Sequence, residues 1–182
     1  MSYQNVRGTT DFLPQDAAQA CRLESAARDV LSRYGYAEIR LPVLEQAAVF
    51  LRGLGETTDI VQKQLFRIEG KDDICLRPEG TAQVVRSCIQ HTLFESNDRT
   101  RKLFYMGPMF RGERPQKGRL RQFHHIGVEA VGGRFAAIDA EVVKLAYDIL
   151  TAFGLENGVH FRVELNSLGS AEDKVRLQDM LR

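Results

Sequence analysis

A strongly basic loop between two strand-like segments is the feature that most constrains how this chain can fold. The segments are residues 103–111 and 121–129, and nine residues, 112–120, separate them. A tight hairpin turn needs only about two to five residues, so a loop of this length is expected to have a function. The sequence therefore predicts two strands whose connecting loop is part of a site.

Positive charge is concentrated at this loop. Residues 99–121 contain eight Lys and Arg and one acid, net +7, whereas the rest of the chain contains 17 basic and 23 acidic residues, net −6. A basic patch in an otherwise acidic protein indicates an anionic ligand at one place. The alternative is a solvated charged loop, and the side-chain pattern of the flanking strand favours the ligand.

Side chains alternate between the two faces of a strand. In the second segment one face combines a cation, an aromatic ring, a polar ring, a gap and a carboxylate: Arg121, Phe123, His125, Gly127 and Glu129. Such a face does not suit a hydrophobic core. It predicts the floor of a site for a ligand that has a phosphate, a flat base and a positive group.

A second candidate site lies at residues 78–81, Pro-Glu-Gly-Thr, before a predicted helix. Thr81 is expected to be the N-cap of that helix, because its hydroxyl can accept from a free backbone N–H. Glu79 is then either an acid stabilised near a helix amino terminus or a carboxylate that pairs with a substrate ammonium. Gly80 would allow the backbone to approach a ligand closely.

The remaining periodicity predicts an α+β fold. Helices are expected over residues 14–34, 44–52, 82–92 and 138–153, and further strands over 36–41, 64–68, 74–77 and 161–165. A last helix is expected to begin at Ser170 with a capping-box-like S-x-x-D pattern. The 182 residues are enough for one domain with a sizeable core.

Several classes of protein are disfavoured. The three cysteines are far apart and form no CxxC pair, which argues against a disulfide framework or a thiolate zinc site and favours a reducing cytoplasm. No segment has the pattern of a signal peptide or of a bilayer span. His124 and His125 are adjacent on a strand and so point to opposite faces, and no metal ligand is predicted.

Four segments carry a resemblance to a known family. Residues 107–129, GPMFRGERPQKGRLRQFHHIGVE, resemble the second signature motif of class II aminoacyl-tRNA synthetases. The pattern FR-x-ERPQ-x-GR-x-RQFH is similar to the version found in histidyl-tRNA synthetases. Residues 7–14 (RGTTDFLP), 76–81 (LRPEGT) and 165–169 (LNSLG) resemble other elements of that family, in the same order.

The resemblance implies the class II catalytic core, a mostly antiparallel sheet flanked by helices. Residues 14–42 resemble the family's first motif, which builds its dimer interface; a plain helix–strand unit is the equally favoured alternative. The family's third motif and anticodon-binding domain should lie beyond residue 182. The chain is therefore expected to be a truncated, partial catalytic domain, inactive or weakly active alone, from a cytoplasmic enzyme that is a homodimer at full length.

The implied reaction has two steps. Histidine attacks the α-phosphate of ATP to form histidyl-adenylate, and the histidyl group then passes to tRNA(His). The resemblance assigns Arg111 to the α-phosphate as the catalytic residue, because a guanidinium offers phosphate a planar fork of donors. It places Glu113 near adenine, Arg119 at the outer phosphates and Phe123 against the adenine ring. Mg²⁺ is expected with ATP, without identifiable protein ligands.

On the amino-acid side, the resemblance implies that Glu79, Gly80, Thr81 and His125 surround the ammonium and that Glu129 meets the imidazole. Glu129 lies six residues beyond Phe123, roughly 20 Å along a strand, which can separate a nucleotide end from an amino-acid end. The family usually has glutamine at the position of His125. A neutral imidazole can still accept from an ammonium, whereas a protonated one would repel it.

Two other functions compete with this one. A catalytically silent synthetase-like subunit could sense histidine for its biosynthesis, but it would have no reason to keep phosphate-binding arginines. A nucleic-acid-binding hairpin would explain the basic loop but not Glu79, Thr81 and Glu129.

Overall fold

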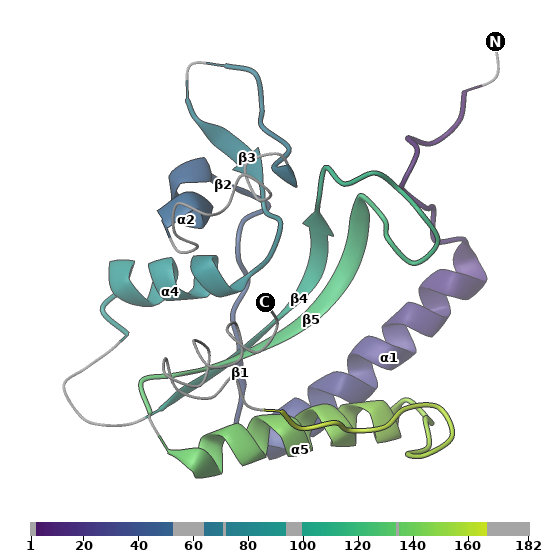
Figure 1. Cartoon of the computed structure of the whole chain (residues 1–182), viewed down its shortest axis with the longest axis vertical. Coiled ribbons are helices and arrows are strands. Elements are labelled where there is room, and N and C mark those ends of the chain that lie inside the picture. Colours follow the sequence, from purple (N-terminus) through teal and green to yellow (C-terminus); the bar gives the residue numbers. More distant parts are fainter. Residues whose placement is uncertain (1–2, 53–63, 71, 94–99, 134, 167–182) are drawn as a thin grey trace, which may run out of the picture.

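The computed structural model describes residues 3–52, 64–70, 72–93, 100–133 and 135–166. Its elements in chain order (Figure 1) are α1 (Pro14–Arg33), β1 (Ala37–Glu38), β2 (Leu44–Gln46), α2 (Ala47–Arg52), β3 (Ile74–Leu76), α4 (Thr81–Gln90), β4 (Arg101–Phe110), β5 (Gln122–Val131) and α5 (Ala136–Ala152). Helices pack on a mixed, mostly antiparallel sheet, and the predicted α+β class is confirmed.

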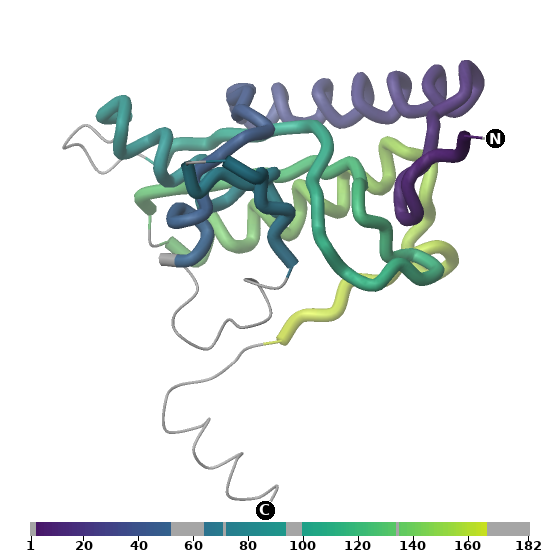
Figure 2. The backbone as a smooth tube through the Cα atoms, turned by 90° about the horizontal axis from the view of Figure 1, so that it is seen from above, coloured from purple at the N-terminus to yellow at the C-terminus, as the bar shows by residue number. Residues whose placement is uncertain are grey.

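The long hairpin of β4 and β5 is the centre of the fold. The two strands pair antiparallel from Arg101↔Val131 to Phe110↔Gln122, and β1 pairs in parallel with β4, so the sheet order is β1-β4-β5. A separate antiparallel pair joins β2 to β3. The predicted antiparallel hairpin is confirmed, within a sheet that is mixed because of β1. The loop after β4 projects from one end of the hairpin (Figure 2).

Helices cover both faces of this hairpin (Figure 1). On one face, α1 and α5 pack against the sheet through a buried cluster of Ala27, Val30, Leu31, Tyr36, Phe104 and Leu145. On the other face, α4 packs through Val84, Cys88, Tyr105 and Met109. A smaller cluster under α2 and β3 contains Ala47, Phe50, Leu65 and Cys75.

The two clusters confirm the predicted alternation of β5. Ile126 and Val128 pack against the α1–α5 cluster, whereas Phe123 packs against the α4 cluster. The Glu129 carboxylate also lies on the α4 side, since it accepts a hydrogen bond from Thr81 at the start of that helix. Phe123 and Glu129 therefore occupy the same face of the sheet.

Two predictions of secondary structure were wrong, because pairing with a distant strand, or the lack of such a strand, determined the backbone conformation. The helix expected over residues 44–52 begins as β2, because residues 44–46 pair with β3, and continues as α2. The strand expected over 161–165 is absent except for an isolated bridge between Asn157 and Phe161. Val163 and Leu165 are 46% and 79% exposed, and the described residues offer them no strand partner.

Other boundaries moved without changing the arrangement. The strand expected over 36–41 shrinks to β1, and residues 64–68 contact β3 through backbone hydrogen bonds without forming a regular strand. Thr81 is the first residue of α4, and its predicted N-cap role is wrong, since Gly80 occupies the cap position. The helix expected from Ser170, and residues 167–169 of the LNSLG segment, lie outside the described residues.

Candidate active site

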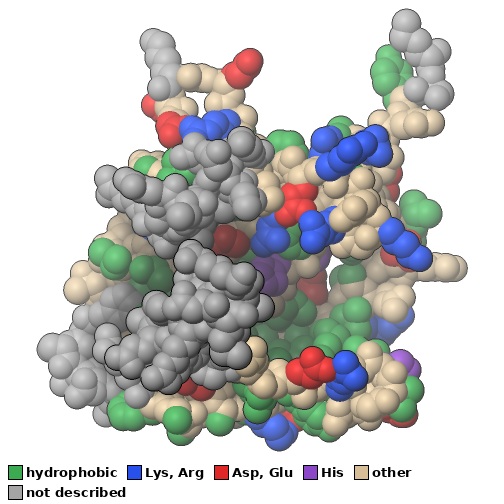
Figure 3. Space-filling model, in the orientation of Figure 1, with side chains coloured by type: hydrophobic (Ala, Val, Ile, Leu, Met, Phe, Trp, Pro, Cys, Tyr) green, Lys and Arg blue, Asp and Glu red, His purple; other side chains and the backbone are tan. Residues whose placement is uncertain are grey.

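The face of the hairpin toward α4 contains the candidate site. A space-filling view shows a hollow on this side, with basic and acidic side chains at its rim and a histidine side chain within it (Figure 3). The residues predicted for ATP gather at the loop end of the hairpin, and those predicted for histidine gather at the start of α4. The site therefore has two ends on one continuous face.

At the loop end, the structure forms a cavity of about 450 Å³. It is lined by Arg111, Glu113, Gly118, Arg119, Leu120 and Phe123. All four residues predicted to bind ATP are in this lining. Gly118 and Leu120 were missed, because loop residues have no periodicity from which a facing direction can be inferred.

Arg111 is held in a defined orientation beside the cavity. Its Nε donates to the backbone carbonyl of Pro78 over 3.1 Å, and its guanidinium carbon lies 5.0 Å from the centre of the Phe123 ring. Its backbone N–H donates to the carbonyl of Arg121 over 2.9 Å. A guanidinium has five N–H donors, so this contact with Pro78 orients the group while using one of them. The arrangement suits an anion bound next to an aromatic surface.

Across the loop, Arg119 pairs with Glu113 at 3.6 Å. The Arg119 side chain is 66% exposed and that of Glu113 is 21% exposed. An exposed ion pair of this length contributes little stability, about 0–1 kcal/mol. Arg119 can therefore exchange this contact for a phosphate at low cost.

At the amino-acid end, Glu129 is a half-buried acceptor. Its Oε1 accepts from the Thr81 hydroxyl over 2.6 Å and lies 3.5 Å from the Tyr105 hydroxyl. The pKa of the Glu129 carboxyl is raised above its ordinary value, and burial is the largest cause. The charge of Glu79 raises this pKa further, whereas the hydrogen bonds from Thr81 and Tyr105 partly oppose the increase. A carboxylate in this setting gains strongly from a hydrogen-bond donor or a cation on a ligand.

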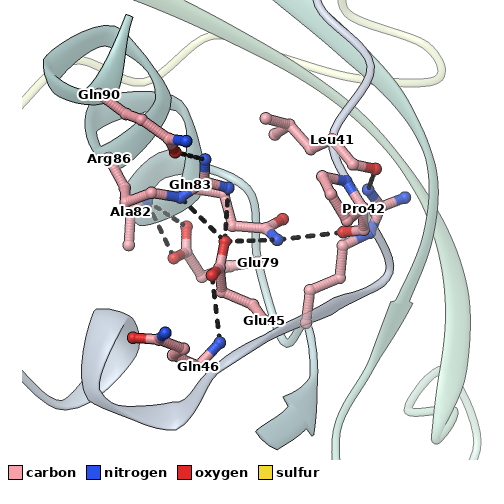
Figure 4. A network of polar contacts seen from close by, with 10 residues as sticks. Leu41, Pro42, Glu45, Gln46, Glu79, Ala82, Gln83, Arg86 and Gln90 are labelled. Carbon is pink, nitrogen blue, oxygen red and sulfur yellow. Dashed lines mark hydrogen bonds and ion pairs between the residues drawn. The ribbon is translucent and has the colours of Figure 1, made fainter.

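Glu79 caps α4 from the turn before it (Figure 4). Its carboxylate accepts from the backbone N–H of Thr81 and, over 3.1 Å, from that of Ala82. This is the helix-terminus role that the sequence left open, and it places a negative charge at the positive end of the helix. Pairing of the same carboxylate with a substrate ammonium remains a prediction.

A polar network fixes α4 relative to the segment that follows β1 (Figure 4). The Glu45 carboxylate accepts from Arg86 over 2.6 Å and from the Gln83 side chain over 3.2 Å. The same Gln83 amide nitrogen donates to the Pro42 carbonyl over 3.0 Å. Gln83 is fully buried, so these contacts hold the first turns of α4, and with them Glu79, in one position.

Tyr105 forms the back wall of the amino-acid end, and sequence reasoning missed it. It is 3% exposed, and its ring lies between two glycines: a Cβ built on Gly80 or on Gly127 would be 2.2 Å from its Cζ. Burial is the main cause that raises the Tyr105 pKa to about 12, so the hydroxyl remains a donor at neutral pH. Register places Tyr105 opposite Gly127, so that a large ring faces a gap, and this pairing is visible only in the folded chain.

His125 connects the two ends of the site. Its ring makes a T-shaped contact with Tyr105 at 5.7 Å and lies 6.5 Å from the Phe123 ring. Burial lowers the His125 pKa, the nearby charge of Arg111 lowers it further and Glu79 opposes the shift. Its Nδ1 is buried and has no hydrogen-bond partner within the described part of the chain. The shift favours the neutral imidazole, and binding of a ligand by this ring remains a prediction.

Among the described residues, no group of three or more His, Cys, Asp and Glu side chains is placed to hold an ion. In the same residues, no helix has the length and apolarity needed to cross a membrane.

Comparison with known proteins identifies close relatives of this chain. The family model described as histidyl-tRNA synthetase matches residues 8–170. Histidine–tRNA ligase from Geobacillus thermodenitrificans is 49% identical over 176 residues, which are 96% of this chain and 41% of the relative. The ligase from Aquifex aeolicus is 48% identical over 183 aligned residues, covering 100% of this chain and 44% of the relative. The chain thus spans about two-fifths of the length of the curated relatives it matches.

Solved structures show the same fold. The crystal structure of apo histidyl-tRNA synthetase from S. aureus superposes with a TM-score of 0.69 at 36% identity, covering 85% of this chain and 36% of that one. A Bacillus halodurans protein described as an ATP phosphoribosyltransferase regulatory subunit/histidyl-tRNA synthetase superposes with a TM-score of 0.72 at 23% identity, covering 85% and 39%. The second likeness concerns the fold alone.

Proposed function

Because the chain belongs to the histidyl-tRNA synthetase family, we propose that it forms the ATP- and histidine-binding part of a histidine–tRNA ligase. One observation supports this most directly: a single strand face joins the cavity beside Arg111 and Phe123 to the half-buried carboxylate of Glu129. That order matches a nucleotide and an amino acid bound end to end. Residues 1–182 are then part of a class II catalytic domain.

In the proposed first step, a carboxylate oxygen of histidine attacks the α-phosphorus of ATP and pyrophosphate leaves. Such a displacement requires positioned reactants and donors aimed at the charge that develops on the phosphoryl oxygens. Arg111 is proposed as that donor, since its Nε–H contact with Pro78 already orients the guanidinium beside the cavity. In the second step a ribose hydroxyl of tRNA(His) attacks the activated carbonyl and AMP leaves.

The nucleotide is proposed to lie in the cavity with adenine against Phe123 and near Glu113, and with its outer phosphates at Arg119. Aromatic stacking and exposed cations suit these parts of ATP. Mg²⁺ is proposed to arrive with the triphosphate.

Histidine is proposed to bind with its ammonium near Glu79, Gly80, Thr81 and His125 and its imidazole at Glu129. Glu129 is a half-buried acceptor that already takes hydrogen bonds from Thr81 and Tyr105, and the imidazole N–H would supply a further donor. Desolvation of His125 supports the same arrangement, since a neutral ring accepts from an ammonium instead of repelling it.

The proposed partners are tRNA(His) and, in the complete enzyme, a second copy of the chain; the proposed location is the cytoplasm. The competing function, a regulatory subunit that senses histidine, is not favoured. Relatives that are 48–49% identical to this chain over the aligned residues are named as ligases. The arginines at the cavity are also those that nucleotide chemistry needs.

The test is histidine- and ATP-dependent exchange of pyrophosphate, measured on this chain and on a version extended by the remaining sequence of its relatives. We expect exchange in the extended protein and little or none in the chain alone. Calorimetry on the chain alone should detect ATP and histidine separately. An extended, folded protein that binds histidine but supports no exchange would favour the regulatory function instead.

A further inference from the structure

The amino-terminal segment contacts the loop between β4 and β5 where the loop returns to the sheet (Figures 1 and 2). The carbonyl of Gly8 accepts from the backbone N–H of Arg121 over 2.7 Å and from that of Gln122 over 3.2 Å. The carbonyl of Arg7 lies 3.5 Å from the Arg121 Nη1 donor. Residues more than a hundred positions apart are thus joined where the loop ends and β5 begins.

The side chain of Arg121 connects this segment to the other end of the loop. Its Nε donates to the carbonyl of Glu113 over 3.3 Å, while its own carbonyl accepts from the backbone N–H of Arg111 over 2.9 Å. Arg121 therefore connects the amino-terminal segment to both ends of the loop, near Arg111 and Glu113 at its start and at Arg121 itself at its end. Strand alternation predicts this cation on the ligand face, and in the structure its side chain contacts the loop and the amino-terminal segment.

The close approach depends on glycine at position 8. Gly8 has φ of +91°, and a Cβ there would lie 2.9 Å from Cγ of Arg121 and 2.9 Å from Cγ of Pro115. A side chain would be both strained and obstructed. The adjacent turn is already organised, because the backbone N–H and the hydroxyl of Thr9 both donate to the Val6 carbonyl, over 2.9 and 2.7 Å.

A second contact supports β5 from its other face. The ring of Phe12 stacks on His124 with centroids 5.0 Å apart and an interplanar angle of 25°. His124 follows Phe123 directly, so this stack lies on the opposite side of the strand from the cavity. The start of β5 is therefore held from behind at the residue next to one that lines the cavity.

We propose that residues 7–12 form an amino-terminal clamp that holds the loop in the shape in which its side chains line the cavity. The clamp's hydrogen bonds with the hairpin involve Arg121 and Gln122, where the loop joins β5, and its ring contact is with His124 on the far face of β5; in the described residues none of these contacts is with a residue of the amino-acid end. It therefore positions the nucleotide-binding residues and sets affinity for ATP while leaving histidine affinity unchanged. The ATP part of this inference rests on the proposed function; the effect on the loop does not.

The first test is cleavage of the loop by trypsin, which requires no ligand. Lys117 and Arg119 are exposed, and cleavage after them reports how often the loop leaves its folded shape. We expect Gly8→Ala and Phe12→Ala to accelerate cleavage at these two bonds by about fivefold or more, the effect of losing one net hydrogen bond or a comparable contact. Phe12→Tyr keeps the stack and should behave like the parent.

Tyr3→Ala is the matched control, because it removes an aromatic ring of the same segment that is 94% exposed. Thermal unfolding of every variant shows whether the rest of the fold is intact. If Gly8→Ala unfolds the chain, the cleavage rates of Phe12→Ala and Phe12→Tyr decide whether residues 7–12 hold the loop. Cleavage that is unchanged in folded Phe12→Ala and Gly8→Ala would overturn the clamp.

The second test measures ATP and histidine affinity of the same variants by calorimetry. We expect ATP affinity to fall about fivefold or more and to return in Phe12→Tyr, with histidine affinity unchanged. Equal losses for both ligands, or faster cleavage without any loss of ATP affinity, would overturn the positioning role. A parent chain that binds no ATP would overturn the proposed function, and the cleavage result would still decide whether residues 7–12 hold the loop.

Discussion

At the residue scale, the site depends on a few side chains whose chemistry is set by burial. Glu129 and His125 lie on one strand face, and desolvation is the largest cause of both pKa shifts, upward for the acid and downward for the base. Both shifts favour the neutral form. Each group is therefore prepared to gain from a ligand that restores the hydrogen bonds lost on burial.

Arg111 is the residue whose replacement should most affect adenylation. In a form of the enzyme that supports pyrophosphate exchange, Arg111→Ala is expected to lower the exchange rate about a hundredfold or more, the effect of removing one preorganised donor. Arg111→Lys should also lose most of the rate, because an ammonium cannot copy the planar fork. Exchange within a few-fold of the parent in the folded alanine variant would contradict the assigned role.

Glu129→Gln tests the amino-acid end. The amide keeps the shape but loses the charge that a bound imidazole N–H would meet, so histidine affinity should fall about tenfold or more. ATP affinity should change far less, since Glu129 is not in the lining of the loop cavity. Calorimetry with each ligand separately gives the comparison, and equal losses for the two ligands would count against this assignment.

His125 should make stability depend on pH. Its folded pKa lies below the ordinary value of 6.5, so the unfolded chain binds the proton more readily and stability falls as pH drops below about 6.5. His125→Gln removes this contribution, which is at most about 1.4 kcal/mol per pH unit. Glu129, whose pKa is raised, acts in the opposite direction and at lower pH.

Urea unfolding of both proteins between about pH 7.5 and pH 5.5 measures this difference. We expect the parent to lose stability relative to His125→Gln across that interval. Curves that run parallel over the whole interval would show that the imidazole is not desolvated.

At the element scale, the β4–β5 hairpin and the start of α4 are held together by the ring of Tyr105. The ring fills the space left by Gly80 on one side and Gly127 on the other. The network around Glu45 and Gln83 then fixes α4 in the same position. The distance between the turn at Glu79 and the strand at Glu129 is thus a consequence of packing as well as of polar contacts.

Gly127→Ala tests this packing. A Cβ at this position would lie 2.2 Å from a buried ring, so the ring or the strand must shift, and unfolding free energy is expected to fall by roughly 1–3 kcal/mol. Gly70→Ala is the matched control, since a Cβ there meets no described residue within 4 Å, and its effect should be about 0.5 kcal/mol or less. Urea unfolding compares the two, and equal effects would contradict the account.

At the scale of the whole molecule, the site rests on a sheet that has a separate buried cluster on each face. The α1–α5 side contains no residue assigned to ATP or histidine. It is expected to supply stability, while the α4 side supplies the site. Truncating a side chain in the α1–α5 cluster should therefore lower the free energy of unfolding without changing affinity for ATP or histidine.

Leu145→Ala tests this division. Leu145 is fully buried among residues of α1 and β4, and its truncation should cost about 2–5 kcal/mol. Val143→Ala on the same helix removes a side chain that is 37% exposed and should cost much less. Urea unfolding measures both costs. Affinity for ATP and histidine, measured well below the unfolding transition, should be unchanged in both variants.

Much of the site could be predicted from local order along the chain. Strand alternation is a property of the backbone, so the shared face of Phe123, His125 and Glu129 followed from their spacing alone. The charge of the loop and the Pro-Glu-Gly-Thr turn were visible in the same way. The roles of these residues toward ATP and histidine remain predictions that the experiments above address.

The remaining features depend on contacts between residues that are distant in the sequence. Residues 44–46 became a strand because β3 was available to pair with them. Tyr105 forms the back wall because the β4–β5 register places it opposite Gly127. The Gly8 carbonyl accepts from the backbone N–H of Arg121 because the fold brings the amino-terminal segment next to the start of β5. Periodicity tells which face a side chain shares within one element. It cannot tell which other element that face contacts. That choice depends on close packing between elements and on the hydrogen bonds that buried backbone groups need, and both are set only in the folded chain.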